Sequence, residues 1–496
     1  MTTLIPRPPY TEDELRRLYP STLELRQVQV LMRHGERTPV SARFQNAGLR
    51  PFWPYCHSVR QIRSAVLENG GDMGDAHSAK GRIPFTTLEW KRRIETFGPN
   101  DEPVVAAGPS GEVDDICDMG SLTDLGRHTT SKLGARLRLL YVDQLGFLPP
   151  NLSSFGHFYL RSTPVTRALE SLQQTLSALF PPSTRTPDEN GRIPVPVILS
   201  RAPNDETLYP NDGNCRRYAA LARAFAQRAA DRWNETEDMK YLTSVFGKWM
   251  PENSPRVAVD SRPRLSGIMD TINATRAHGP QTKLPDEFYD EKAAAIIAKI
   301  ANDEWFSGYK ESREYRMLGV GGLLGDIVAR MVRSAEQAGQ HQPAGNKEEH
   351  GPTPADPPLK FGLSGCHDTT LAGVLASLGA FHGTEWPPFT SHIALEMFAA
   401  RGGDEGAAES PAPRGWWAAF SAPAAPTASI GRRATPELTA AEAKKLEGFY
   451  VRLRYNDVPV TIPGCKGPGK HLEGDETFCT LVSNSRVCMS FFSRVF

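Results

Sequence analysis

The segment RHGERTP, at residues 33–39, concentrates residue types that can bind and transfer a phosphoryl group. Arg33 and Arg37 flank His34, and a guanidinium fork matches two phosphate oxygens at once. A histidine inside such an anion site can attack phosphorus as a nucleophile. Because neighbouring cations lower the pKa of an imidazole, we expect His34 to stay neutral and nucleophilic below neutral pH. The alternative interpretation is a solvated basic turn.

His367 and Asp368 are a second pair of residues that could take part in catalysis. They follow a short strand-like segment and precede an apolar-periodic segment that predicts a helix. A helix N-terminus adds positive potential for a phosphate, and an aspartic acid beside it can protonate a leaving oxygen. The alternative is that Asp368 only caps a helix over residues 369–379. The presence of RHGERTP in the same chain favours the catalytic interpretation.

Alternating strands and helices must position these residues. Residues 25–32 are rich in Val and Leu and predict a buried strand that ends at the RHG sequence. Residues 156–160 predict a second strand, followed by a helix over residues 168–180, and Thr123 is expected to cap another helix. This alternation predicts an α/β fold with a doubly wound, largely parallel sheet and helices on both faces. Ligands of such folds bind beyond the carboxyl ends of the strands.

The chain of 496 residues is too long for one simple core, so a second region is expected. The α/β catalytic core is assigned to residues 1–43, 119–200 and 316–481, with mobile surface insertions at 335–358 and 400–441. A smaller cap domain, built from insertions, is assigned to residues 44–118 and 201–315. The cap is expected to be mainly helical, with irregular backbone over 44–118, and to shape the substrate pocket. Residues 482–496 form an atypical tail.

Composition excludes several classes of function. Lys and Arg total 57, as do Asp and Glu, so no overall field attracts nucleic acid or an anionic membrane. No apolar run reaches the length of about 18 residues that a membrane span needs. The N-terminal sequence has neither a signal peptide nor a mitochondrial presequence, so an intracellular, cytoplasmic location is expected. Seven cysteines without CxxC or zinc spacing are expected to be mostly free thiols.

The order of several segments resembles the histidine acid phosphatases, a branch of the histidine phosphatase superfamily. RHGERTP matches the RHGxRxP hallmark of that family. SLTDLG at 121–126, RSTPVTR at 161–167 and SGCHDTTL at 364–371 also resemble family segments, in family order. LYPNDGNCRRY, LGVGGLLGDI and FYVRLRYND extend the resemblance over most of the chain. The family-like sequence ends near Val482, where either a lineage-specific tail or a gene-model error begins.

The resemblance implies a role for individual residues. His34 would be the phosphorylated nucleophile and Asp368 the acid that protonates the leaving group. The phosphate would be bound by Arg33, Arg37, Arg167 and His367. Arg161 would be structural. Pro164 stands where the family usually has Asp, which leaves the pose of Arg167 open. No metal ion and no cofactor are implied.

The activity implied by the resemblance is that of an acid phosphatase that hydrolyses phosphate monoesters through a phosphohistidine. A phosphatase similar to the lysophosphatidic acid phosphatases is the first alternative, so the expected partner is a small phosphate monoester or a lysophospholipid. A phytase ranks third, because the expected cap mixes charges of both signs. A catalytically silent binding or scaffold protein of the same fold is the alternative from another class. The sequence indicates no oligomeric state.

Overall fold

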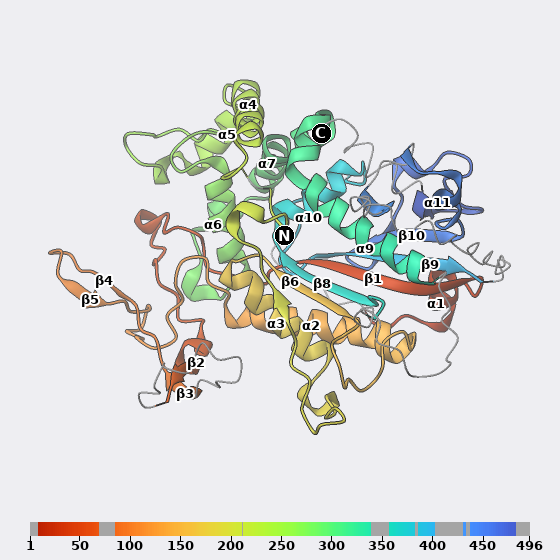
Figure 1. Cartoon of the computed structure of the whole chain (residues 1–496). Coiled ribbons are helices and arrows are strands. Elements are labelled where there is room, and N and C mark those ends of the chain that lie inside the picture. Colours follow the sequence, from red (N-terminus) through yellow and green to blue (C-terminus); the bar gives the residue numbers. More distant parts are fainter. Residues whose placement is uncertain are drawn as a thin grey trace, which may run out of the picture.

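The structure is a computed structural model of the whole chain (Figure 1). It describes residues 8–68, 85–210, 212–338, 357–381, 385–401, 430–432 and 437–482. Most of the two predicted insertions, 335–358 and 400–441, and all of the predicted tail beyond Val482 lie outside these ranges. Within them, no helix combines the length and hydropathy that a bilayer crossing requires.

The centre of the molecule is a nine-stranded sheet, counted over the described residues. Its strands run in the order β12-β13-β10-β9-β1-β8-β6-β7, and β11 pairs with β10. The parallel half comprises β1 (Leu23–Arg33), β8 (Phe361–Cys366), β6 (Phe158–Ser162) and β7 (Ile198–Leu199). The antiparallel half comprises β9 (His392–Ala400), β10 (Phe449–Tyr455), β11 (Val458–Val460), β12 (His471–Leu472) and β13 (Asp475–Thr480).

β1 lies where the two halves meet, with a parallel neighbour on one side and an antiparallel neighbour on the other. Val30 is opposite Leu363 of β8 and Ala394 of β9. All three side chains are buried, as expected for a strand that helices cover on both faces. The strand predicted over residues 25–32 is confirmed, and the one predicted from residue 156 begins two residues later, as β6.

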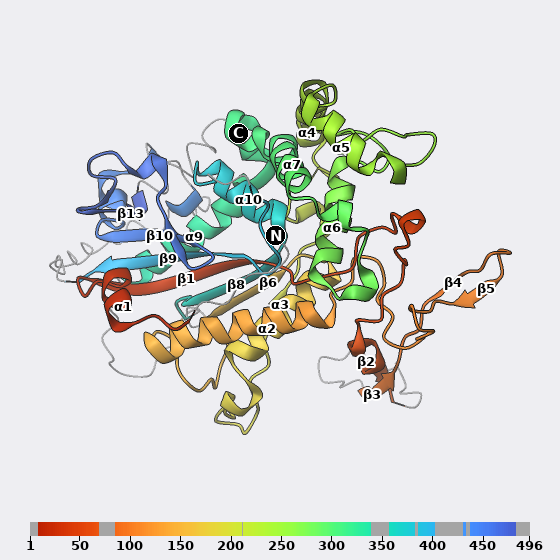
Figure 2. The same ribbon diagram turned by 180° about the vertical axis from the view of Figure 1, so that it is seen from behind.

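Helices cover both faces of the sheet, as predicted (Figures 1 and 2). One face carries α2 (Asp124–Arg138) and α3 (Thr166–Leu179), and the other carries α9 (Gly322–Ala338) and α10 (Asp368–Ser377). Thr123 caps α2 as expected, because its side chain accepts a hydrogen bond from the Gly126 N–H at 3.3 Å. α1 (Glu12–Leu18) and α11 (Ala440–Lys444) are short surface helices, and a π-helix (Leu139–Gln144) continues α2. The predicted α/β fold is therefore confirmed.

A group of helices lies beside this sheet and packs around an apolar interior of its own (Figure 1). The group comprises α4 (Arg216–Trp233), α5 (Glu237–Phe246), α6 (Leu265–Ala277) and α7 (Glu291–Glu311), followed by α8 (Arg313–Arg316). Leu242, Phe246, Ile268, Phe288 and Ile297 are among its buried side chains. The division of the chain into core and cap stays a prediction.

Residues 44–118 contain two hairpins, so the prediction of irregular backbone is wrong for part of this range. β2 (Ile62–Leu67) pairs with β3 (Phe85–Trp90), and β4 (Glu95–Phe97) pairs with β5 (Pro103–Val105). Both hairpins stand away from the body of the molecule (Figures 1 and 2). Every residue of β3 is exposed, so this strand has no buried face to produce the alternation that identifies a strand in a sequence.

Four of the seven cysteines form disulfides, so the expectation of mostly free thiols is wrong. Cys56 pairs with Cys117 across 61 residues, and Cys465 pairs with Cys479 across 14 residues. Cys215 and Cys366 are free, and Cys488 lies outside the described residues. Spacing alone carried no signal for these pairs, because folding of intervening segments brings the partners together.

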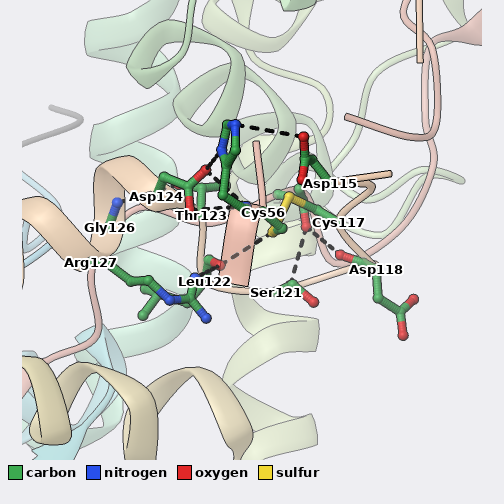
Figure 3. Close-up of a disulfide and its surroundings, with 12 residues drawn as sticks. Cys56, Asp115, Cys117, Asp118, Ser121, Leu122, Thr123, Asp124, Gly126 and Arg127 are labelled. Carbon is green, nitrogen blue, oxygen red and sulfur yellow. Dashed lines mark hydrogen bonds and ion pairs between the residues drawn. A yellow bond between two sulfur atoms is a disulfide. The ribbon is translucent and has the colours of Figure 1, made fainter. Parts of the chain in front are cut away.

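The Cys56–Cys117 disulfide joins the segment after RHGERTP to the segment that leads into α2 (Figure 3). Next to it, the backbone N–H of Cys117 donates to the Trp53 carbonyl at 2.9 Å. The Asp124 carboxylate, at the start of α2, accepts from the backbone N–H of His57 at 3.1 Å. The segments on either side of the histidine motif are thereby fixed to one another.

Candidate active site

The candidate site begins where β1 ends and the chain turns away from the sheet. At this turn Gly35 lies against Gly126 in the first turn of α2. A Cβ atom on Gly35 would be 2.3 Å from the Gly126 carbonyl oxygen, and one on Gly126 would be 2.2 Å from that of Glu36. No side chain fits at either position, so the glycines of RHG and of the SLTDLG segment permit this close approach.

His34 is buried, with 2% of its surface exposed. Its Nδ1 is 2.8 Å from the Gly35 carbonyl oxygen, which can only accept a hydrogen bond, so Nδ1 carries the proton. The lone pair therefore resides on Nε2. Burial, together with the charges of Arg167, Arg33 and Arg37, holds the pKa of His34 well below its usual value. The imidazole is neutral across the acidic range, as the sequence predicted.

Three arginines surround this histidine, and two of them are held by carboxylates. Arg33 Nη2 is 2.7 Å from Asp368 Oδ2, and Arg37 Nη1 is 2.7 Å from Asp270 Oδ1. Arg167 projects from the first turn of α3. Within the described residues, the buried Nε of each of these arginines has no hydrogen-bond partner. Three buried donors without a protein acceptor provide hydrogen bonds for an oxyanion.

His367 is the residue before α10, and its ring centre lies 5.6 Å from that of His34. Its Nε2 is 3.1 Å from the Thr163 hydroxyl oxygen. Burial and the charge of Arg167 lower the pKa of His367 to about 3. A neutral imidazole at this position can donate or accept a hydrogen bond without adding charge.

Asp368 is the first residue of α10, so it is not the helix N-cap that the alternative interpretation required. Its Oδ2 accepts from Trp386 Nε1 at 2.8 Å in addition to its ion pair with Arg33. Burial alone would raise the pKa of this carboxyl, but Arg33 and Trp386 outweigh it and lower the pKa to about 2. Asp368 is therefore ionised at mildly acidic pH in the absence of a substrate.

Arg161 and Arg167 belong to the same motif but occupy different environments. Arg161 is buried against Glu206, with which it forms an ion pair, and lies 3.7 Å from Asp326. Arg167 has no carboxylate at ion-pair distance among the described residues, and it contributes the largest charge effect on the pKa of His34. Pro164 precedes α3, and the charge of Arg167 still acts on His34, whereas its role in binding phosphate stays a prediction.

A cleft of about 350 Å³ reaches the arginines of the RHGERTP segment and Asp368. Arg33, Arg37 and Asp368 line it together with residues of α6 and with Trp305, Trp386 and Phe389. Sequence reasoning missed Asp270, Trp386 and Phe389. The WPPF segment at 386–389 is aromatic enough to attract notice, but Asp270 lies on a helix far along the chain and had no sequence signal. No group of three or more potential metal ligands occurs within the ranges that the structure describes.

Comparison with known proteins identifies the family of this site. The model of the histidine phosphatase superfamily (branch 2) matches residues 24–456. The chain belongs to this superfamily. A probable acid phosphatase of Schizosaccharomyces pombe is 34% identical to this histidine phosphatase, over 93% of this chain and 91% of the relative. Human lysophosphatidic acid phosphatase type 6 is 25% identical, over 76% of this chain and 74% of its own length.

Solved structures share the fold of this histidine phosphatase. The phytase from Citrobacter braakii aligns with a TM-score of 0.52 and 13% identity, over 94% of this chain and 98% of that one. The multiple inositol polyphosphate phosphatase of Bifidobacterium longum, in complex with inositol hexasulfate, aligns with a TM-score of 0.51 and 13% identity. This alignment covers 97% of this chain and 95% of that one. At such identity the likeness concerns the fold alone. The predicted family and enzyme class, a phosphatase of the histidine acid phosphatase type, are confirmed.

The buried neutral His367 makes the stability of this histidine phosphatase depend on pH. Between its unfolded pKa of about 6.5 and its folded pKa of about 3, the unfolded chain binds a proton that the folded chain does not. His367 therefore contributes stability that is complete above pH 6.5 and is lost as the pH falls to 3. Glu36 acts in the opposite sense, because burial raises its pKa to about 7.

The difference in the free energy of unfolding between wild type and His367→Gln isolates the contribution of His367. We expect the free energy of unfolding of wild type, relative to the variant, to fall by roughly 1–4 kcal/mol between pH 6.5 and pH 3.5, since one pKa unit corresponds to about 1.4 kcal/mol. Denaturant titrations at several pH values measure it. A difference that stays constant over this range would contradict the lowered pKa.

Proposed function

We propose that this histidine phosphatase hydrolyses phosphate monoesters at acidic pH through a phosphohistidine at Nε2 of His34. The observation that carries the proposal is the state of His34: a buried, neutral imidazole whose Nδ1–H is bound by the Gly35 carbonyl. Arg33, Arg37 and Arg167 supply the positive charge that three phosphate oxygens require, so the proposal needs no metal ion or cofactor.

In the first step, Nε2 of His34 attacks phosphorus in line with the leaving oxygen. A monoester that binds as its monoanion brings one proton on a phosphate oxygen, and the ionised Asp368 accepts this proton. The bond from phosphorus to the ester oxygen breaks, and Asp368 delivers the proton to that oxygen, so a neutral alcohol leaves. The imidazole then carries a phosphoryl group on Nε2 and keeps its proton on Nδ1.

In the second step, water displaces His34 from phosphorus. Asp368, ionised again after the first step, takes a proton from the attacking water and returns it to the phosphate product. Trp386 and the helix start at α10 orient the carboxylate for both steps through the contacts described above. The cycle ends with neutral His34 and phosphate monoanion, so protons and charge balance.

Replacing His34 should abolish turnover because it removes the nucleophile. We expect His34→Ala to retain less than about a thousandth of the wild-type kcat, within the range for the loss of a nucleophile. His128→Ala, which removes an exposed histidine of α2, is the control and should retain activity. Acid-quenched wild type should contain phosphohistidine. More than a tenth of the wild-type kcat in folded His34→Ala would show that another group attacks phosphorus.

Removing the proton carrier should affect substrates according to their leaving groups. A nitrophenolate leaves without a proton, whereas an alkoxide does not, so Asp368→Asn should slow an alkyl phosphate far more than p-nitrophenyl phosphate. General acid catalysis contributes about 10²- to 10⁴-fold, which sets the expected difference between the two substrates. Single-turnover rates at pH 5 measure it. Equal slowing of both would assign Asp368 to phosphate binding.

A lysophospholipid monoester is a second candidate substrate, favoured by a cavity of about 420 Å³ beside the catalytic cleft. The cavity shares Arg264, Trp305 and Thr369 with the cleft. Much of its lining is aromatic or apolar: Tyr209, Tyr218, Ala219, Ala222, Phe306, Tyr309 and Tyr315. An alkyl chain that enters it from the phosphate site would gain about 0.8 kcal/mol for each buried methylene. The human relative named above supports this class of substrate.

Filling this cavity should lower the activity on a lysophospholipid much more than the activity on a small monoester. Ala222→Trp places an indole where the chain would lie, so we expect kcat/KM for lysophosphatidate to fall at least tenfold and that for p-nitrophenyl phosphate to change less than about twofold. Ala298→Trp is the matched control, because Ala298 lines a different cavity of about 410 Å³, which shares Met269, Asn273 and Trp386 with the cleft. If Ala222→Trp leaves the lysophosphatidate rate unchanged, the chain does not bind there.

We propose that the helices α4 to α7 form the cap predicted at residues 201–315, since they enclose their own apolar cluster and two of them, α6 and α7, line the cleft.

The intracellular location also stays a proposal. Disulfides persist in oxidising compartments and are rare in cytosolic proteins, so the two disulfides favour a lumenal compartment over the cytoplasm.

A further inference from the structure

A carboxylate that the mechanism does not use lies among the phosphate-binding arginines. Asp270 projects from α6, and its Oδ1 is 2.7 Å from Arg37 Nη1. Its Oδ2 is 3.2 Å from Arg43 Nη1 and accepts the backbone N–H of Val40 at 3.1 Å. The side chain is only 12% exposed. A carboxylate at this position lowers the positive potential that Arg37 and Arg43 present to an anion.

Asp270 is part of a wider pattern of charge pairing in the cleft. The cleft is lined by four arginines, Arg33, Arg37, Arg43 and Arg264. Arg33 is paired with Asp368, Arg37 and Arg43 are both paired with Asp270, and Arg264 is paired with Glu304. Every arginine of the cleft wall thus faces a carboxylate already. Arg167 is the cation near His34 whose charge no described carboxylate matches at ion-pair distance.

We propose that Asp270 determines specificity by restricting the enzyme to substrates with a single phosphate group. This inference rests on the proposed phosphatase function. One phosphate bound at His34 can draw on Arg167 and on the free Nε donors of Arg33 and Arg37. A second phosphate on the same molecule, placed in the cleft, would meet Asp270 and cations that this carboxylate has neutralised. The resulting repulsion is only partly screened by solvent, because the Asp270 side chain is only 12% exposed.

The geometry also explains why the charge, rather than the shape, of this residue matters. An asparagine at position 270 has the same size, and its single carbonyl oxygen can still accept a hydrogen bond either from Arg37 or from the Val40 N–H. It removes the negative charge and replaces one acceptor oxygen by a donor, which frees positive potential at Arg37 and Arg43 for a second phosphate. Asp270→Asn therefore tests the proposal with little change in packing, whereas Asp270→Glu keeps the charge and changes the length.

The experiment compares kcat/KM for myo-inositol hexakisphosphate and for p-nitrophenyl phosphate in the full-length enzyme. We expect the ratio of the two values to rise at least tenfold in Asp270→Asn, and to change less than threefold in Asp270→Glu. Asp231→Asn is the matched control: it removes one exposed carboxylate from α4, away from the cleft, and should leave both values within about twofold. Asp270→Ser, which also removes the charge, replaces Asp270→Asn if thermal unfolding shows that the latter does not fold.

The outcomes separate this inference from the proposed function. A wild type without activity on p-nitrophenyl phosphate would overturn the proposed function itself. An active wild type, with Asp270→Asn and Asp270→Ser that lower both kcat/KM values by the same factor, would show that Asp270 only positions Arg37. A ratio that rises equally in Asp231→Asn would show that overall charge, not this site, sets the preference. Each of the last two results would overturn the specificity role alone.

Discussion

The candidate site buries several positive charges, and the elements around it are arranged so that carboxylates neutralise these charges. A site that binds a phosphate dianion or monoanion needs several cations close together, yet such cations repel one another and lose hydration when buried. The structure meets the constraint with carboxylates from separate elements: Asp368 from α10 holds Arg33, and Asp270 from α6 holds Arg37. The same ion pairs join the sheet edge to the helices beside it. Assembly of the site and attachment of these helices therefore depend on the same contacts.

The pairing also determines which groups carry protons. Burial and the cations favour neutral His34, and the cations favour ionised Asp368. In the absence of substrate, the proposed nucleophile is therefore neutral and the proposed acid has no proton to donate. A phosphate that binds to the arginines weakens their hold on Asp368 and brings a negative charge, and both changes favour protonation of the carboxyl. In the proposed mechanism, proton uptake by Asp368 is thus coupled to substrate binding, and a monoanionic substrate supplies the proton.

Buried arginines serve the scaffold as well as the site, and their partners distinguish the two uses. Arg452 and Arg454 of β10 share the buried carboxylate of Glu396 in the neighbouring strand β9, where Tyr19 and Tyr141 also donate to it. Each charge there has its partner within hydrogen-bond distance. Such closed networks have no capacity for a ligand, whereas the arginines near His34 retain donors without a protein acceptor. Arg161 also has a buried Nε without a described acceptor, so such a donor indicates a phosphate site only where it lies beside His34.

Features of this protein that depend on the local order of residues along the chain could be predicted from the sequence alone. The strand before His34, the helix capped by Thr123 and the strand-to-helix junction at His367 follow from apolar periodicity and capping chemistry, which are local properties. The resemblance then indicated residues 33, 34, 37, 167, 367 and 368, which the fold brings to one edge of the sheet. Only the tertiary structure could pair Cys56 with Cys117, expose both faces of β3, and place Asp270 against Arg37. These features depend on contacts between segments far apart in the chain, and such contacts leave no periodic trace in the sequence. The low pKa of Asp368 belongs to the same class, because its causes, Arg33 and Trp386, lie on other segments.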